Sequence, residues 1–497
     1  MKRAPLTLAA VTAALAAVTG VAVLTAPAAP AAADAKARQQ SAARLPVERS
    51  TLVCPAPSTS DIAETTYTTI TPGKPGTSKG GARLTGATKD AKPLLEPKTP
   101  GTPVGASSTG AEAPALTGTA DGALAPGWTA QQTTQVAVGQ ARGLLGVACT
   151  APGTEFWFPG ASTAKGRQDY VHLTNADDTP AVVDIQLFGP DGALKTEAGS
   201  GENIKIGPKS SVPVLLSTIA PGAQLADLTA HVTTRSGRVG ASVQVAEEGV
   251  GADWLPASTD PAGSLVLPGI PADATSVRLI AYAPGEEDAD LKLRLAGPGA
   301  SITPAGNEQL HVKGGMSASV DLKDVTRGEA GSLVLTPSDG RKATPVVAAL
   351  RVVRGTGTKQ ELGFIAASGP VGARATVADN RTDTGATTVS LTVPAGAADA
   401  KVRITASPGT QGGEAAAKEF TVKAGTTLLV PQPPAPAGGK GSYALTVETL
   451  SGGPVHAART LSLPHEGIPM FTVQTFTDDH GTVPVPKAVQ DLSILTD

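Results

Sequence analysis

The six histidines of this chain are the first candidates for acid–base and metal-binding chemistry. Hydrolytic chemistry needs a nucleophile, a base and an orienting group held close together, and a metal site needs several ligands. The sequence contains neither an H-E-x-x-H nor a C-x-x-C pattern. We therefore expect no catalytic centre, no cofactor and no metal, and we interpret each histidine as a surface or edge-strand residue. The six are His172, His231, His311, His456, His465 and His480.

The acidic run GEEDAD is a second candidate for chemistry. Its carboxylates could ligate calcium, a cation that takes oxygen ligands. Like charges also cluster on solvated loops, so we favour a hairpin loop without calcium here. The segments NADDT and FTDDHG have the same interpretation. The carboxylates of the run belong to Glu286, Glu287, Asp288 and Asp290.

The segment TEFWFPGAS, residues 154–162, concentrates three aromatic side chains in a chain that is only 3% aromatic. A sugar-binding cleft normally has aromatic walls, for which this sequence offers few residues. Phe156, Trp157 and Phe158 precede a proline at a position where related segments of the chain have aliphatic residues, so we predict packing at a domain junction. The alternative is a ligand platform, and the candidate ligand contacts are then Trp128, Trp157 and Trp254.

Composition argues against nucleic-acid binding and in favour of a β-rich fold. The net charge is −3, whereas nucleic-acid binding requires a clustered basic face. The 57 glycines and 42 prolines favour many turns and short strands over long helices.

The N-terminal residues predict export. Lys2 and Arg3 precede an uncharged apolar run that ends in small residues, which is typical of a secretory signal peptide over residues 1–33. The alternative is an uncleaved anchor, because the run is close to membrane-spanning length. We expect a protein that is secreted or associated with the cell envelope and that touches the membrane only through this segment, if it is retained.

The two cysteines, Cys54 and Cys149, are expected to form an intramolecular disulfide in an oxidising compartment. Closing a loop of this length stabilises a fold by about 4–5 kcal/mol in the chain-entropy model. The alternatives are two free thiols or an intermolecular bridge.

Four sequence landmarks recur with a period of roughly 105–110 residues. The period is too long for a solenoid repeat and matches one whole β-sandwich of about 100 residues. Within each period, runs such as DYVHLTN and AVVDIQLFG alternate apolar and polar residues, and turn residues separate the runs. The landmarks are Pro55, Pro159 and Pro268; Pro190, Pro298 and Pro408; Ile204, Leu310 and Phe420; and Ser236 and Ser451.

We therefore predict an all-β fold, a tandem array of about four Ig-like β-sandwich repeats of roughly 105–110 residues. Residues 71–110 are rich in proline, glycine, threonine and serine, and we expect them to form a flexible surface insertion in the first unit. Cys54 and Cys149 would then connect the first and last strands of that unit. The expected organisation is a signal peptide (1–33), β-sandwich units at 34–153, 154–261, 262–370 and 371–477, and an extended C-terminal tail (478–497).

The stretch FWFPGASTAKGRQDYVHLTNADDTPAVVDIQLFGPDGAL resembles a family of secreted actinobacterial proteins catalogued only as a domain of unknown function, DUF5719. The resemblance extends from LPVERSTLVCPAPS through LVLPGIP and PVVAALRVVRG to the C-terminal tail. It implies export and a repeated fold, points to envelope polysaccharide as the setting, and brings no catalytic residues.

These observations predict an exported, non-catalytic scaffold or interaction module of the cell envelope. Sandwiches in series would make a rod, which suits spacing and display. The alternative is a cell-wall glycan-binding protein or an accessory subunit of envelope polysaccharide synthesis. The expected partner is an envelope polysaccharide or an envelope protein, and not nucleic acid.

Overall fold

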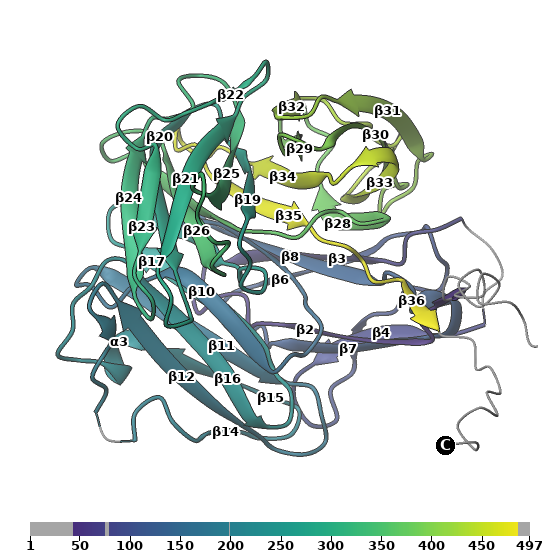
Figure 1. Ribbon diagram of the computed structural model, residues 1–497. Coiled ribbons are helices and arrows are strands. Elements are labelled where there is room, and N and C mark those ends of the chain that lie inside the picture. The colour runs from purple at the N-terminus through teal and green to yellow at the C-terminus, as the bar shows by residue number, and fades with distance from the viewer. Residues whose placement is uncertain (1–42, 75–78, 198, 486–497) are drawn as a thin grey trace, which may run out of the picture. The chain divides into compact units, whose positions relative to one another are not determined.

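The computed structural model describes residues 43–74, 79–197 and 199–485 of the 497-residue chain. Strands make up 55% of the structure and helix 2%, and the antiparallel sheets pair as Ig-like sandwiches (Figure 1). The predicted fold class is therefore confirmed. The expected signal peptide, residues 1–33, lies outside the described residues, as do residues 486–497 of the expected tail.

The first sandwich pairs the sheet β2-β7-β4-β5 with the sheet β6-β3-β8-β9. Its strands are β2 (Arg49–Cys54), β3 (Glu64–Ile70), β4 (Ala82–Gly86), β5 (Pro93–Leu95), β6 (Val104–Thr109), β7 (Leu116–Asp121), β8 (Thr129–Val136) and β9 (Gly143–Ala148), with a short 3-10 helix at Gly122–Leu124.

The second sandwich pairs β10-β16-β12-β13, to which β14 adds on β12, with β15-β11-β17-β18. Its elements are β10 (Glu155–Ala161), β11 (Arg167–Asn175), β12 (Ala181–Gly189), β13 (Gly192–Ala193), β14 (Ile204–Ile206), β15 (Ser210–Leu215), α3 (Leu216–Ile219), β16 (Leu228–Ser236), β17 (Gly240–Glu247) and β18 (Gly251–Leu255).

The third sandwich pairs β19-β25-β21-β22, to which β23 adds on β21, with β24-β20-β26-β27. Its strands are β19 (Leu265–Ile270), β20 (Ala274–Tyr282), β21 (Ala289–Ala296), β22 (Ser301–Ile302), β23 (Gln309–Val312), β24 (Ser317–Lys323), β25 (Gly331–Pro337), β26 (Val347–Arg354) and β27 (Glu361–Ala366).

The fourth sandwich pairs β28-β33-β30-β31 with β32-β29-β34-β35. Its strands are β28 (Arg374–Asn380), β29 (Thr387–Val393), β30 (Ala398–Ala406), β31 (Ala416–Val422), β32 (Thr426–Val430), β33 (Tyr443–Gly453), β34 (His456–Ser462) and β35 (Phe471–Phe476). Two further strands, β1 (Ala43–Pro46) and β36 (Thr482–Val485), pair with each other in a sheet that belongs to a separate unit of the chain.

The same strand order occurs in all four sandwiches. In the first and fourth sandwiches, one sheet holds the first, sixth, third and fourth strands, and the other holds the fifth, second, seventh and eighth. The second and third sandwiches follow the same order when the two short strands that pair with the third strand, β13 and β14 or β22 and β23, are counted together as the fourth. Alternating apolar side chains from both sheets form a core in each sandwich, as Val171 and Leu173 of β11 do with Val183 and Ile185 of β12. The sequence period thus corresponds to one complete sandwich topology.

The expected flexible insertion at residues 71–110 is wrong for the part that the structure describes. Strands β4, β5 and β6 lie in this segment and pair with β7, β4 and β3. These are the third, fourth and fifth strands of the repeat, so the segment completes the first sandwich. Leu84 and Leu95 are buried in the core of this sandwich. Their burial offsets the conformational entropy that is lost when this segment, rich in proline and glycine, becomes ordered.

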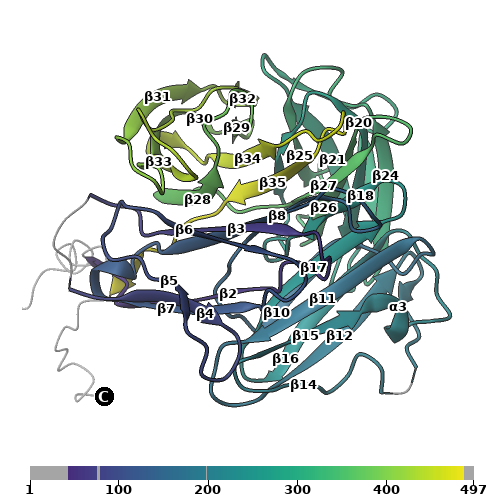
Figure 2. The ribbon, with the colours of Figure 1, turned by 180° about the vertical axis from the view of Figure 1, so that it is seen from behind.

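The four sandwiches do not follow one another as a rod, because the first also contacts the fourth. Apolar clusters join the first sandwich to the second, the second to the third and the third to the fourth. Leu144 of β9 packs with Leu461 and Met470 of the fourth sandwich, and Ile70 of β3 packs with Ala378. Strand β28 contacts β3 and β8, and β35 contacts β9, and Figures 1 and 2 show β28 beside β3 and β8. The array therefore closes on itself.

Among the described residues, no helix has the length and apolar character of a membrane span.

Candidate functional site

The turn formed by residues 164–167, between β10 and β11, contributes to two cavities. One has a volume of about 360 Å³ and is lined by Ser217, Gln224 and Glu248, together with a residue of the first sandwich. The other has a volume of about 520 Å³ and is bounded by arginines of the third sandwich. Charged side chains surround this turn, which makes it the candidate site.

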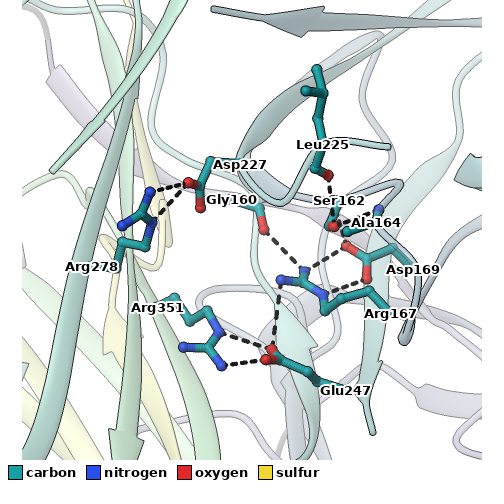
Figure 3. A network of polar contacts seen from close by, with 10 residues as sticks. All are labelled: Gly160, Ser162, Ala164, Arg167, Asp169, Leu225, Asp227, Glu247, Arg278 and Arg351. Atoms are coloured by element: carbon teal, nitrogen blue, oxygen red, sulfur yellow. Dashed lines mark hydrogen bonds and ion pairs between the residues drawn. The ribbon is translucent and has the colours of Figure 1, made fainter. Parts of the chain in front are cut away.

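Arg167 and Asp169 form the buried half of a polar network (Figure 3). They stand two residues apart on β11, so both side chains project from the same face of the strand. Arg167 Nε donates to Asp169 Oδ1 at 3.0 Å and Nη2 donates to Oδ2 at 2.7 Å. The amide of Ser162 donates to the same carboxylate at 2.8 Å. Burial raises the pKa of Asp169, and the charge and hydrogen bonds of Arg167 oppose that shift.

The other half of the network crosses from the second sandwich to the third. Arg351 of β26 donates to both carboxylate oxygens of Glu247, at 2.9 and 2.7 Å. Arg278, the register partner of Arg351 on β20, donates to Asp227 Oδ2 at 2.8 Å. Ser319 also donates to that oxygen, at 3.0 Å. Bidentate arginine–carboxylate pairs add geometric specificity as well as attraction.

This arrangement fixes orientation. Each of the three carboxylates in the network accepts from an arginine, and two of the three pairs join different sandwiches. Figure 3 shows the three acidic side chains directed toward the guanidinium groups. The charged groups of this network therefore compensate one another and hold the second sandwich against the third.

Trp157 packs at the same junction, as the sequence predicted. Its side chain is buried and stacks on the ring of His231 with centroids 3.5 Å apart. It also contacts Tyr282 of the third sandwich, at a centroid distance of 5.5 Å, and clusters with Val347. The aromatic segment at residues 154–162 is a junction element.

The two other tryptophans are core residues as well. Trp128 is 5% exposed and donates from Nε1 to Thr69 Oγ1 at 2.9 Å. Trp254 is 2% exposed. Its ring packs against the ring of His172 in a T-shaped arrangement, with the centroids 5.1 Å apart. None of the three candidate ligand contacts presents a ring face at the surface.

Cys54 of β2 and Cys149, just after β9, are joined by a disulfide across 95 residues. The predicted intramolecular bridge is therefore confirmed, and it connects the first and last strands of the first sandwich.

The interpretation of the histidines as surface or edge-strand residues is wrong for two of them. His172 and His456 are 6% and 7% exposed, and burial lowers the pKa of each to about 4. Strand β11 lies inside its sheet, between β15 and β17, and His172 faces the junction with the first sandwich. His456 Nδ1 lies 3.0 Å from the carbonyl oxygen of Ser368. His311 and His480 are exposed, and His231 and His465 are partly buried.

The acidic segment pairs with basic side chains of its own sandwich. Asp290 Oδ1 lies 2.8 Å from His311 Nδ1, and Arg341 Nε lies 3.2 Å from Asp290 Oδ2. Lys342 Nζ donates to Glu287 at 2.7 and 2.8 Å. Within the part of the chain that is described, no three His, Cys, Asp or Glu side chains form a group that could hold a metal.

Residues 104–433, about two thirds of the chain, match the family model described as "Family of unknown function (DUF5719)". The chain belongs to this family. The match begins at β6 and ends shortly after β32, so it includes the whole second and third sandwiches and the network between them. No curated protein matches the sequence.

Sequence reasoning missed the charged residues that this DUF5719 member buries. Arg167 and Asp169 carried a usable signal, because an ionic pair at alternate positions of a strand projects from one face. Asp253, within GADWL, and Glu361, before LGFIA, each interrupt an otherwise apolar or small-residue strand. Such isolated carboxyls mark a buried polar contact, but the sequence does not identify the partner.

Proposed function

We propose that this protein is an exported, non-catalytic scaffold or interaction module of the cell envelope. The observation that supports the proposal best is the use of its charged side chains at the junction of the second and third sandwiches. Asp227 and Glu247 hold Arg278 and Arg351 across that junction. At this junction, the carboxylates and arginines that could otherwise act on a substrate instead hold the second sandwich against the third.

Export is supported by the disulfide between Cys54 and Cys149, since such bonds persist mainly in oxidising compartments. The proposed partner is an envelope protein or an envelope polysaccharide. The three tryptophans no longer favour glycan binding over protein binding, because each ring is buried. A closed array of sandwiches would present a rigid surface to such a partner, rather than the extended rod expected from the repeats.

Cross-linking on intact cells tests this proposal. The full-length protein is treated with an amine-reactive cross-linker, and attached components are identified by mass spectrometry and sugar analysis. A matched pair of variants separates the junction from general surface charge. Glu247→Lys places a cation against Arg167 and Arg351, whereas Glu248→Lys changes the exposed neighbour.

If the scaffold role requires the sandwiches to keep their orientation, the wild type and E248K are expected to form cross-links to envelope components. E247K is then expected to form fewer cross-links at equal protein abundance. Two results would contradict the proposal. One is the absence of any envelope component from the wild-type cross-links. The other is turnover of an envelope polysaccharide by the purified protein.

A further inference from the structure

Two cavities flank the turn between β28 and β29 of the fourth sandwich. The larger one, of about 620 Å³, lies between the third and fourth sandwiches and includes Gln135 of the first in its lining. The smaller one, of about 470 Å³, lies between the first and fourth sandwiches. Asp383 of the turn lines both cavities, and we call the two together the hydroxyl cleft. Each volume is in the range of pockets that bind small molecules, about 300–1,000 Å³.

Hydroxyl groups of inner strands line the larger cavity. They belong to Thr388 and Ser390 of β29 and to Thr460 of β34. Thr388 pairs in register with Thr460, so their side chains lie on one face of the sheet, opposite to the core residue Val389. Ser390 and Thr460 are 4% and 9% exposed, yet none of the three hydroxyls has a hydrogen-bond partner among the described residues. These buried hydroxyls are therefore available to a ligand.

Unpaired polar side chains also line the smaller cavity. Thr66 of β3 and Ser107 of β6 are register partners there, and Gln411 of the fourth sandwich lines the cavity as well. Their side chains have no hydrogen-bond partner in the described part of the chain. Gly105 allows the two sandwiches to approach closely, because a Cβ at this position would lie 3.1 Å from Thr410 Cγ2.

The charges in the cleft favour an uncharged ligand. Arg354 Nη2 donates to Asp273 Oδ2 at 2.7 Å, and Arg381 is paired with Asp379. Among the described residues that line the two cavities, Asp383 is the one charged side chain without an ion pair. An acidic ligand would be repelled by this carboxylate, whereas both arginines are already paired.

The remaining lining matches the chemistry of a sugar. A serine or threonine hydroxyl both donates and accepts hydrogen bonds, as each sugar hydroxyl does. Ile270, Leu429 and Leu463 also line the larger cavity and provide apolar contact for the C–H groups of a sugar ring. The cleft thus offers both kinds of contact that a sugar ring requires.

A peptide fits the cleft less well. Peptides bind mainly by main-chain pairing at a free sheet edge or by apolar anchors in a groove. Strands β29 and β34, which carry the hydroxyls of the larger cavity, both lie inside their sheet, in the order β32-β29-β34-β35. Their main-chain groups are therefore already paired with neighbouring strands.

We propose that the hydroxyl cleft binds an uncharged glycan chain, whose hydroxyls bond to the free hydroxyls of both cavities and to Asp383 between them. The inference rests on the proposed function and deepens it, because it selects a neutral envelope polysaccharide as the partner. The described lining contains no aromatic ring, so the contact with each sugar is weak. Affinity therefore increases with the number of sugars bound.

Titration calorimetry of the full-length protein tests the proposal. The probes are oligosaccharides of two to eight sugars, released from the envelope polysaccharide of the cells that produce the protein and separated by anion exchange into a neutral and an acidic pool. The wild type is expected to bind the neutral pool with an affinity that rises with length. It is expected to bind the acidic pool about tenfold more weakly, because of the unpaired carboxylate.

Three variants locate the binding. Thr460→Val removes one free hydroxyl at nearly constant shape, and it is expected to weaken binding of the neutral pool by about three- to tenfold, the value of one hydrogen bond. Thr384→Trp blocks the larger cavity from an exposed turn position, and it is expected to abolish binding even if T460V does not fold. Thr421→Val is the matched control, because Thr421 is exposed on β31 outside both cavities, and T421V should bind like the wild type.

Absence of binding to either pool would overturn the proposal, and so would equal affinity for both pools or equal affinity of the wild type and T384W. Cross-linking of T384W on intact cells separates this failure from that of the proposed function. If T384W attaches envelope components as the wild type does, the cleft is not the site, and the scaffold role still stands. Capture of an envelope protein that is lost in T384W would assign the cleft to a protein partner and overturn the glycan proposal.

Discussion

Arg459 is a buried charged residue whose burial bears on the stability of the molecule. It lies on β34, is fully buried, and none of its three guanidinium nitrogens has a partner among the described residues. Burial lowers its pKa to about 10. Removing a charge of this kind in favour of an apolar side chain of similar length is often neutral or stabilising.

Arg459→Met is therefore expected to leave the stability unchanged or to raise it by about 1–2 kcal/mol. Urea unfolding at pH 7 measures the effect. Arg351→Met is the comparison, because Arg351 pairs with Glu247 and its loss leaves that carboxylate without its bidentate partner. A loss of stability in R459M as large as in R351M would show that Arg459 has an essential partner.

The two buried histidines predict weakness in acid. The pKa of His172 and that of His456 are each lowered to about 4, whereas the unfolded chain binds these protons near pH 6.5. The unfolded state thus binds more protons between these values, and stability is lost as the pH falls from about 6.5 to 4, by up to about 3 kcal/mol per group.

Replacing His172 with glutamine is expected to flatten this acid dependence while lowering stability at pH 7 through lost packing on Trp254. Melting temperatures at pH 7 and pH 4.5 measure both effects. The exposed His480 supplies the control, since H480Q removes no buried contact and should leave both melting temperatures close to those of the wild type. Equal acid slopes for H172Q and the wild type would contradict the assignment.

At this scale the sequence predicted Cys54–Cys149 and the junction role of Trp157, and it misplaced His172 and His456. Cysteine pairing and a conspicuous aromatic segment are local signals. Burial of a histidine in a strand depends on whether another sandwich covers that face, and no residue near His172 in the sequence carries that information.

Among the elements, β2 and β9 show how the first sandwich is held together. The disulfide joins the end of β2 to the residue after β9, two strands of different sheets. Replacing both cysteines with serine is expected to destabilise the fold by about 2–5 kcal/mol, because the unfolded chain is no longer restrained. The midpoint of thermal unfolding measures the loss.

Reduction of the wild type should reproduce that loss, and the same reductant should leave the double variant unchanged. If neither the double substitution nor reduction of the wild type lowers the unfolding midpoint, the disulfide contributes nothing to the stability of this sandwich.

The strand alternation was detectable in the sequence where one face is strongly apolar, as in AVVDIQLFG, and the repeat period came from the recurring landmarks. It failed in residues 71–110. Strand β6, with the sequence VGASST, alternates between partly buried and exposed residues without large apolar side chains, and β5 begins with a proline. Such edge strands are placed by their pairing partners more than by their own residues.

For the whole molecule, the repeat period determined the number of sandwiches but not the angles between them. Closure of the array depends on contacts between residues more than three hundred positions apart, such as Thr68 Oγ1 donating to Asp379 Oδ1 at 3.0 Å. A rod and a closed array share the same strands, turns and cores. What separates them is a small set of outward-facing side chains, which in an isolated sandwich would be surface residues.

Leu144 and Leu461 provide the test of closure, because each is fully buried where the first and fourth sandwiches meet. Leu144→Ala and Leu461→Ala should each cost about 2–4 kcal/mol. In a closed array the two substitutions share one contact, so a double-mutant cycle from urea unfolding should give a coupling energy of about 1 kcal/mol. The control cycle pairs L461A with Leu84→Ala, a core substitution inside the first sandwich that should add independently. Additivity in both cycles would mean that the first and fourth sandwiches are not in contact in solution.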